Sequence, residues 1–220
     1  MSNNENQVKE TQNTFNLLHE VWEWVYTILI ALVIALLIKT YLFDIVCVDG
    51  PSMYPTLTNN DRLIVTKLGY KPHAGDIVIL DSAYKNRQEY YAEYEEFNET
   101  KLNFFSKIAL YVKIPQNLKR KYYVKRIIGM PGDVIDIQNG NVLVNGEILD
   151  EPYYDGVTSI TDYATDYPFT VSDDCVFVMG DNRPNSKDSR SSELGEVPIK
   201  ALAGKSQIRI WPLNALGKTK

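Results

Sequence analysis

The chain has 220 residues, of which 45% are hydrophobic and 23% are charged, and this length suits one anchor segment followed by one globular domain. Its formal net charge of -5 argues against a nucleic-acid-binding protein, because such proteins usually carry a basic face. The sequence contains no HExxH pattern and no cluster of Cys and His, so it gives no indication of a zinc site.

The first segment, residues 1–20, is polar and rich in Asn and Gln, and we expect a disordered tail there. It carries Lys9 against three glutamates, so its charge does not indicate which side of a membrane it would face.

The next segment, residues 21–43, is predicted to be a transmembrane anchor helix. Its centre, residues 25–38, carries no charge, and aromatic residues flank it as they do at membrane interfaces. A helix from Trp22 to Phe43 would be about 33 Å long, which exceeds the ~30 Å hydrocarbon core of a bilayer. A cleaved secretory signal is the alternative. No small-x-small cleavage site follows the apolar run, so we expect a retained anchor.

Residues 44–215 are predicted to form a mainly β, antiparallel domain, because no regular helical pattern separates its apolar runs. The stretch Val134–Leu149 contains two Asn-Gly dipeptides between alternating apolar residues, which predicts two consecutive tight hairpins. Runs rich in β-branched and aromatic residues indicate the remaining strands, at Ile45–Val48, Leu63–Lys67, Ile77–Leu80, Tyr123–Ile128, Cys175–Met179 and Ser206–Trp211.

Residues 84–121 depart from this pattern, and we interpret them as an insertion in the β domain. The segment is rich in Tyr and Glu at first and basic at its end, with partial helical character near Leu102–Val112. We favour a solvated surface excursion here; a segment that touches membrane or substrate is the alternative.

The cysteines and histidines give little indication of chemistry. Cys47 and Cys175 both lie in apolar runs, so we expect buried free thiols. A disulfide between them stays open, because sequence spacing says nothing about distance. His19 lies just before the anchor, so a Ser-His-Asp triad would have to depend on His73.

The first segment with catalytic potential is GPSMYPTL, Gly50–Leu57. Pro51 and Pro55 restrict the backbone on both sides of Ser52, so this serine is expected in a stiff, non-helical segment just after a strand. A stiff mount suits a nucleophile, because misplacement of the nucleophile lowers the rate. Taken alone, a serine between prolines is usually a turn residue.

The second segment is YVKRIIGMPGD, which begins at Tyr123. Side chains alternate across a strand, so Lys125 should share a face with Tyr123 and Ile127, and Arg126 should face the other way. Burial of a lysine lowers its pKa, and a neutral lysine can accept a proton from a serine hydroxyl. A lysine on the solvent face of an edge strand is the alternative.

The third segment is GDNRPNSKDSR, Gly180–Arg190, which concentrates acids, amides, serines and basic residues after an apolar strand. This density favours a fixed polar network over a random loop. An ordered turn without chemistry is the alternative.

Taken together, these segments closely resemble the type I signal peptidases, a family of membrane-anchored Ser-Lys endopeptidases. The matching motifs occur in the family's order after the anchor, and the resemblance covers residues 20–215. They are SMYPTL at Ser52–Leu57, GDIVIL at Gly75–Leu80, KRIIGMPGD at Lys125–Asp133 and GDNRPNSKDSR at Gly180–Arg190.

The resemblance implies roles for individual residues. Ser52 would be the nucleophile and Lys125 its general base, with Ser186 orienting Lys125 through a hydrogen bond. The supporting residues would be an Asp188–Arg190 ion pair and Asp181, which would brace the same loop.

The resemblance also implies an oxyanion and substrate-binding region at Gly50, Ser52, Met53 and Tyr123. Some relatives use a serine two positions before the nucleophile as oxyanion donor, but Gly50 stands there in this chain. Pro51 has no N–H, so the backbone N–H of Ser52 is the expected donor. The strand around Tyr123 would lie alongside the substrate, which would bind as an added strand.

The function that the resemblance implies is removal of N-terminal signal peptides from exported preproteins at the membrane surface, through an acyl-enzyme. The catalytic domain would lie on the extracytoplasmic side of the cell membrane, behind a single span. The expected partners are signal peptides of secreted preproteins, membrane lipid and the secretion machinery, with no nucleic acid and no cofactor. Small residues, often Ala-x-Ala, would precede the cut.

Two other functions are considered. A self-cleaving repressor type of Ser-Lys peptidase is disfavoured by the anchor and by the lack of an N-terminal DNA-binding domain. A specialised or non-catalytic signal-peptidase-like protein acting in pilin or surface-fibre assembly is the second. Loss of the serine or the lysine would indicate the non-catalytic form, and both Ser52 and Lys125 are present.

Overall fold

The computed structural model describes residues 2–93, 114–160 and 166–219, with side chains from residue 19 onward. The chain divides into two compact units, Met1–Phe43 and Asp44–Lys220, and each is considered by itself.

The N-terminal unit is a long helix, α1 (Ser2–Leu37), which continues as a short π-helical segment, η1 (Ile38–Leu42). The helix starts earlier than expected and includes the polar segment for which we expected disorder. Neither Gly nor Pro occurs in residues 2–20, so nothing there interrupts a helix that the apolar segment continues.

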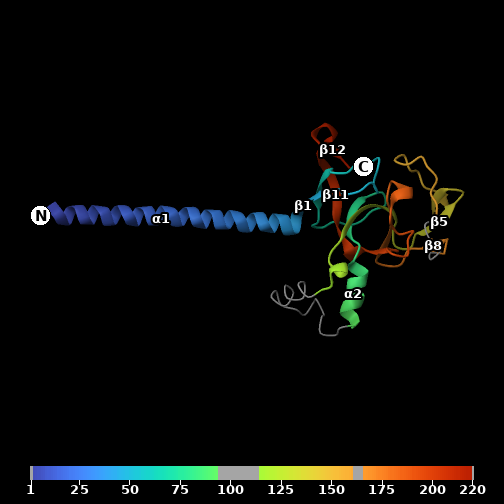
Figure 1. Cartoon of the computed structure of the whole chain (residues 1–220), viewed down its shortest axis with the longest axis horizontal. Coiled ribbons are helices and arrows are strands. Elements are labelled where there is room, and N and C mark those ends of the chain that lie inside the picture. Colours follow the sequence, from blue (N-terminus) through green and yellow to red (C-terminus); the bar gives the residue numbers. More distant parts are fainter. Residues whose placement is uncertain (1, 94–113, 161–165, 220) are drawn as a thin grey trace. The chain divides into compact units, whose positions relative to one another are not determined.

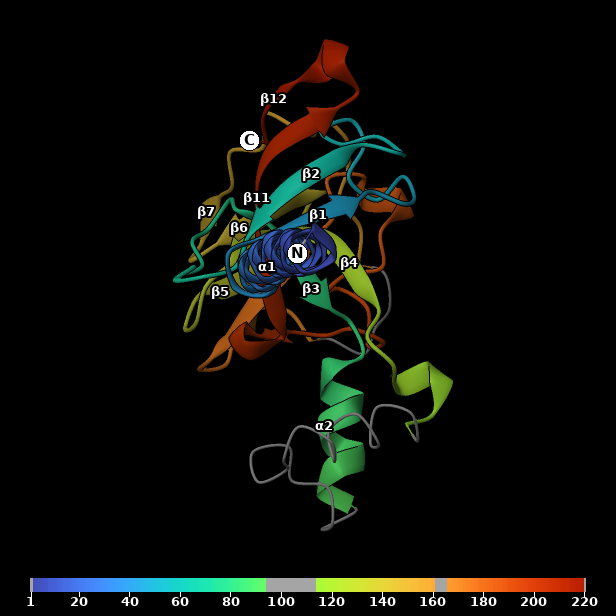
Figure 2. The same cartoon turned by 90° about the vertical axis from the view of Figure 1, so that its left-hand side faces the viewer.

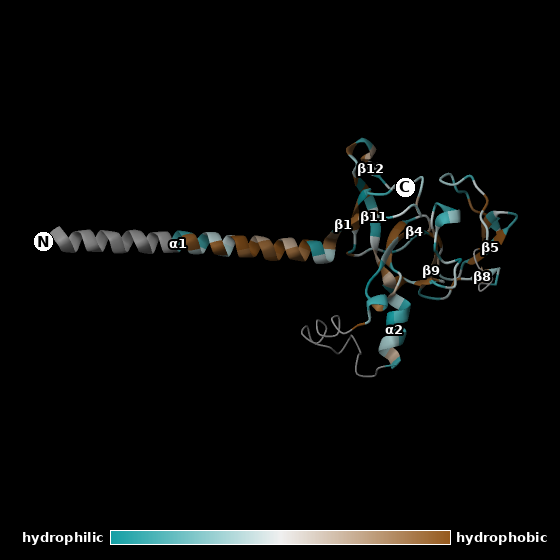
Figure 3. Cartoon of the chain, viewed as in Figure 1, coloured by the Kyte–Doolittle hydropathy of each residue, from teal (hydrophilic) through white to brown (hydrophobic). Residues whose placement is uncertain are grey.

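The apolar part of this helix has the dimensions of a membrane anchor. The 24 residues His19–Leu42 contain an 18-residue window with a mean hydropathy of 2.3, none of which is buried inside the protein. At 1.5 Å per residue they extend over about 36 Å, enough to cross a bilayer. Figure 3 shows this segment as a nearly continuous hydrophobic stretch. One N-terminal apolar helix therefore precedes the β domain along the chain.

The second unit is built on an eight-stranded sheet in which the strands run β1-β2-β11-β3-β4-β9-β10, with β12 pairing β11 (Figure 1). All pairings from β2 to β10 along this order are antiparallel, as expected. The strand bounds are β1 Phe43–Cys47, β2 Arg62–Thr66, β3 Ile77–Asp81, β4 Tyr122–Gly129, β9 Cys175–Met179, β10 Val197–Pro198, β11 Leu202–Trp211 and β12 Gly217–Lys218. Short 3-10 turns, η5 (Ile199–Ala201) and η6 (Leu213–Ala215), flank β11.

A second, four-stranded sheet has the order β7-β6-β5-β8. Its strands are β5 Val134–Gln138, β6 Asn141–Val144, β7 Glu147–Ile148 and β8 Phe169–Thr170. The two predicted hairpins are confirmed, because β5 pairs β6 and β6 pairs β7, both antiparallel. Both Asn-Gly turns have positive φ at each residue, 51° and 82° in the first turn and 56° and 84° in the second. These values are typical of type I′ turns.

The core lies on both faces of the large sheet. Strand β3 is buried throughout and alternates between two clusters, with Ile77 and Ile79 in one and Val78 and Leu80 in the other. The first cluster also includes Met53 and Leu57, each 1% exposed. The segment that carries Ser52 is therefore fastened to the sheet by two buried side chains.

The insertion begins as a helix, α2 (Tyr84–Glu93), which extends below the strands in Figure 2. Its base is tied to the domain, because the buried Arg87 donates to Asp81 at 2.6 Å and to the Leu118 carbonyl at 3.3 Å. Leu118 belongs to a short 3-10 turn, η3 (Gln116–Leu118). The helical character expected near Leu102–Val112 lies outside the described residues.

Both cysteines are free thiols, but neither is fully buried as expected. Cys47 is exposed, because it ends the edge strand β1 on the face that alternates outward. Cys175 is half-buried, and burial is the main cause that raises the pKa of its thiol.

Candidate active site

Ser52 lies in a turn directly after β1 and is half-buried. Two backbone hydrogen bonds stiffen the turn, from Tyr54 N–H to the Pro51 carbonyl at 3.0 Å and from Leu57 N–H to the Met53 carbonyl at 2.8 Å. The buried Met53 and Leu57 hold the turn against the sheet. The serine therefore sits on a rigid mount, as the proline spacing predicted.

Lys125 lies in β4 and is 3% exposed. Its Nζ is 2.8 Å from Ser52 Oγ and 3.1 Å from the Val124 carbonyl oxygen. The Tyr123 ring is on the same side, with its centroid 5.3 Å from the amine. A lysine on the solvent face of an edge strand is therefore excluded, because the Lys125 side chain is buried. At this residue β4 pairs with β3, and its pairing with β9 begins at Arg126.

The surroundings of Lys125 favour its neutral form. Burial lowers the pKa of its ammonium group from 10.5 to about 8, the Asp188 and Asp181 carboxylates oppose this change, and Arg190 adds to it. Desolvation destabilises a charge more than these neighbours stabilise it. Neutral amine is thus available near neutral pH, within hydrogen-bonding distance of a hydroxyl.

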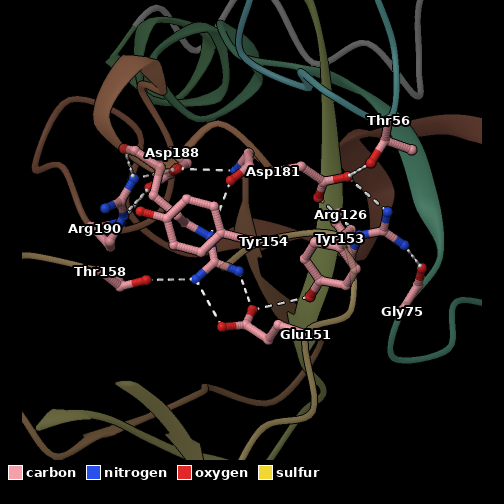
Figure 4. Close-up of polar contacts among 12 residues, drawn as sticks. Thr56, Gly75, Arg126, Glu151, Tyr153, Tyr154, Thr158, Asp181, Asp188 and Arg190 are labelled. Carbon is pink, nitrogen blue, oxygen red and sulfur yellow. Dashed lines mark hydrogen bonds and ion pairs between the residues drawn. The ribbon is translucent and has the colours of Figure 1, made fainter. Parts of the chain in front are cut away.

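Arg126 points to the other side of β4, as the strand alternation predicted, but it too is buried. It forms a two-pronged ion pair with Asp181, with Nε 2.8 Å from Oδ1 and Nη2 2.7 Å from Oδ2 (Figure 4). It also donates to the Gly75 carbonyl at 2.9 Å. Asp181 Oδ2 accepts a further bond from Thr56 Oγ1 at 2.5 Å. Asp181 thus connects β4, its own loop and the Ser52 turn.

Asp188 and Arg190 form a second two-pronged pair, with both N···O distances 2.9 Å and both side chains 0% exposed. Asp188 also accepts the Gly180 N–H at 3.0 Å, and Arg190 donates to the Arg183 carbonyl at 2.7 Å. These bonds close residues 180–190 into a fixed loop. The expected ion pair is therefore present.

Ser186 differs from the expectation. We expected its hydroxyl to hydrogen-bond Lys125, but within the described part of the chain Ser186 Oγ has no hydrogen-bond partner. The second bond of the Lys125 amine goes instead to the carbonyl of Val124, its own neighbour in β4. Ser186 is buried against Gly180, where an added Cβ would lie 2.3 Å from its Oγ and 2.4 Å from the Ser52 carbonyl oxygen. Ser186 and Gly180 therefore pack close to the backbone of Ser52.

The turn from Gly50 to Met53 contains one backbone donor, the Ser52 N–H, that is available to a substrate. Gly50 has φ +98° and donates its N–H to Asn59 Oδ1 at 3.0 Å. Among the described residues, none accepts a hydrogen bond from the Ser52 N–H. Met53, expected near the substrate, is a core residue by burial. A hollow of about 340 Å³ lies beside the turn, lined by Asp49, Gly50, Pro51, Tyr54, Leu57, Thr58 and Asn59.

Sequence reasoning missed the buried Arg183 and its partners. Its guanidinium contacts the Glu151 carboxylate and donates to Thr158 Oγ1 at 2.8 Å. Tyr153 donates to the same carboxylate at 3.0 Å, and its ring lies 3.9 Å from the Arg126 guanidinium (Figure 4). Burial, first of all, raises the pKa of Tyr153, so its hydroxyl stays a donor. The one signal for Arg183 in the sequence was its position inside the dense polar motif Gly180–Arg190.

His73 does not supply a triad. Its side chain is 75% exposed, and its ion-pair contact is with Asp76 at 3.8 Å. In the described ranges, no group of three or more His, Cys, Asp or Glu residues is arranged to hold a metal ion.

A serine hydroxyl beside a buried lysine amine on a β scaffold is the arrangement that a serine peptidase with a lysine base requires. A family described as signal peptidase, peptidase S26, matches residues 21–211. The chain is 36% identical to signal peptidase I S of Bacillus subtilis (strain 168) over 212 residues, which cover 90% of this chain and 94% of that protein. It is 34% identical to signal peptidase I of Bacillus licheniformis over 220 residues, covering 94% and 98%.

A crystal structure of a signal peptidase I from Enterococcus faecalis matches with a TM-score of 0.40 and 24% identity, covering 62% of this chain and 97% of that one. From the family match and the curated relatives, the chain belongs to the type I signal peptidases of the S26 serine peptidase family.

Proposed function

We propose that Ser52 and Lys125 form the catalytic dyad of an endopeptidase that removes N-terminal signal peptides from exported preproteins. The observation that carries the proposal is the 2.8 Å contact between Ser52 Oγ and the buried Lys125 amine. A hydroxyl is a weak nucleophile until a base removes its proton, and a desolvated amine can act as that base.

The reaction would proceed in two halves. The neutral Lys125 amine takes the Ser52 proton while Oγ attacks the scissile carbonyl carbon, and the oxygen that becomes negative is bound by the Ser52 N–H. The C–N bond then breaks, and the leaving amine takes the proton from Lys125. A water molecule, deprotonated by Lys125, hydrolyses the acyl-enzyme and restores Ser52.

The two buried ion pairs would support this reaction without taking part in it. The Asp181–Arg126 and Asp188–Arg190 pairs each bring opposite charges together at distances of 2.7–2.9 Å. Each pair is neutral as a whole, so the loop can be rigid and polar without leaving an uncompensated charge beside Lys125.

The apolar helix suits a substrate that is itself in a membrane. Ser52 lies thirteen positions after Lys39, and a fully extended chain of that length reaches at most about 45 Å. The nucleophile would therefore be tethered near the membrane surface, where a signal peptide emerges. We place the catalytic domain on the extracytoplasmic side, with a single span as anchor.

The test uses the full chain in lipid vesicles with a preprotein whose signal peptide ends in Ala-x-Ala, and the product mass identifies the cut. Ser52→Ala and Lys125→Ala should each lower cleavage by at least about 10³-fold, because the nucleophile or its base is lost. Lys200→Ala is the matched control, because Lys200 is exposed on η5. Retained cleavage by a folded Lys125→Ala variant would refute the dyad.

A further inference from the structure

Asn182 contacts two successive backbone carbonyls of the nucleophile turn. Its N–H donates to the Ser52 carbonyl at 3.0 Å, and its side-chain Nδ2 donates to the Pro51 carbonyl at 3.0 Å. It lies at the start of the 3-10 turn η4 (Arg183–Asn185). The Pro51 carbonyl also accepts the Tyr54 N–H from within the turn, and among the described residues Asn182 is the one donor to these two carbonyls from outside the turn.

Asn182 is itself held in one orientation. Its Oδ1 accepts from Asn185 Nδ2 at 3.2 Å, and its backbone carbonyl accepts from Asn185 N–H at 3.0 Å. The preceding residue, Asp181, is 0% exposed and fixed by Arg126. The amide nitrogen is therefore directed at Pro51 by a rigid support.

The bond to the Pro51 carbonyl has a consequence for the Ser52 N–H, because both belong to one peptide group. A trans peptide is planar, so its C=O and N–H point in opposite directions. Fixing the carbonyl on one side fixes the direction of the N–H on the other. A donor on the carbonyl also polarises the peptide, which strengthens the N–H as a donor.

We propose that Asn182 is a positioning residue that aims and polarises the Ser52 N–H toward the oxyanion of the transition state. This inference rests on the proposed function, in which the Ser52 N–H is the oxyanion donor. Asn182 itself needs no contact with the substrate. Its loss should therefore slow the step in which negative charge develops on the scissile oxygen and leave the binding of the peptide unchanged.

The kinetic test compares Asn182→Ala with Asn141→Ala in the full chain, using a synthetic signal peptide. Asn141 is the matched control, because it is exposed at the start of β6 in the other sheet. Loss of a whole oxyanion donor costs roughly 10²–10³-fold in kcat, so a misdirected donor should cost about 10- to 100-fold. KM and the midpoint of the pH–rate profile should stay unchanged.

A second measurement isolates the oxyanion. Ser52 Oγ adds to the carbon of an Ala-x-Ala peptide aldehyde, its proton passes to Lys125, and the aldehyde oxygen becomes the oxyanion. The matching peptide alcohol has no carbonyl and reports on binding alone. Asn182→Ala should lower the affinity for the aldehyde by the same factor as it lowers kcat/KM, and it should leave the affinity for the alcohol unchanged. Asn182→Asp should lose at least as much, because a carboxylate cannot donate to the Pro51 carbonyl.

The outcomes separate the two proposals. Wild-type kcat in Asn182→Ala, or equal loss of aldehyde and alcohol affinity, would overturn the positioning role. A shift of the pH midpoint with unchanged aldehyde affinity would overturn it as well. If the wild-type chain neither cleaves the peptide nor binds the aldehyde, the proposed function fails instead. Thermal unfolding of each variant shows whether a loss of activity results from loss of the folded state. If Asn182→Ala is unstable, the same measurements on Asn182→Asp decide the proposal.

Discussion

At the scale of single residues, the site depends on one lysine that is kept out of water. Lys125 is buried on β4, and its amine has only Ser52 Oγ and the Val124 carbonyl as hydrogen-bond acceptors within the described residues. Neither acceptor is charged, so desolvation remains the largest influence on its protonation. Burial therefore removes solvation from the ammonium ion and leaves a fraction of neutral amine near neutral pH, which the proposed mechanism needs as its base.

The pH dependence follows from that pKa. Because the active form is the neutral amine and burial lowers the Lys125 pKa to about 8, activity should be lost as the pH falls below that value. Single-turnover rates should rise about tenfold per pH unit between roughly pH 6 and 7.5, and level off above about pH 9. Circular dichroism over the same range checks that the fold is unchanged. A rate that is flat from acid to alkaline pH would contradict a lysine base.

At the scale of elements, the loop of residues 180–190 positions the turn of Ser52 and the strand of Lys125 relative to each other. Asp181 bonds to Arg126 on β4 and to Thr56 beyond Ser52, while Asn182 bonds to the carbonyl of Ser52. Gly180 leaves no room for a Cβ between the Ser52 carbonyl and Ser186. The loop holds its own shape through the Asp188–Arg190 pair.

Breaking the Asp188–Arg190 pair should destabilise the protein, whereas breaking an exposed ion pair in the same region should not. Asp188→Asn leaves Arg190 charged, buried and unpaired, which should lower the free energy of unfolding by about 3–5 kcal/mol in urea titrations. Glu193→Gln removes the partner of Lys187, whose side chain is 66% exposed, and should leave stability unchanged within error. Since the Asp188 carboxylate raises the Lys125 pKa, its loss should also move the pH–rate midpoint downward. Equal stability of the two variants would show that the loop is not held by this pair.

At the scale of the whole molecule, the chain joins a helix whose surface suits lipid to a domain whose surface suits water. The helix exposes an apolar surface over His19–Leu42, while the domain Asp44–Lys220 buries its own core on both faces of the large sheet. Anchoring an enzyme in the membrane of its substrate raises the effective concentration of each for the other.

Removal of residues 1–42 tests this division. The shortened chain should cleave a short synthetic peptide in solution at a rate within about threefold of the full chain. It should cleave a vesicle-bound preprotein at least about tenfold more slowly, because the tether is lost. Product formation on both substrates is measured side by side, with circular dichroism as a check of folding. An equal loss on both substrates would mean that the helix is needed for the domain itself.

The sequence by itself determined most of the elements and indicated Ser52 and Lys125, the pair that we propose as the dyad. Strands, hairpins and the apolar helix follow from periodicity and from local turn residues such as Asn-Gly, and these signals act over a few positions. The motifs also singled out Ser52 and Lys125, and Asp188 and Arg190, which the structure brings into contact.

The tertiary structure alone decided which groups meet across the chain. It gave the second Lys125 bond to Val124 and not to Ser186, and it joined Asn182 to Pro51 across 131 positions. Arg183 and Glu151 are joined in the same way, across 32 positions. Such contacts depend on sheet register and on where backbone carbonyls point, and neither leaves a periodic pattern in the sequence.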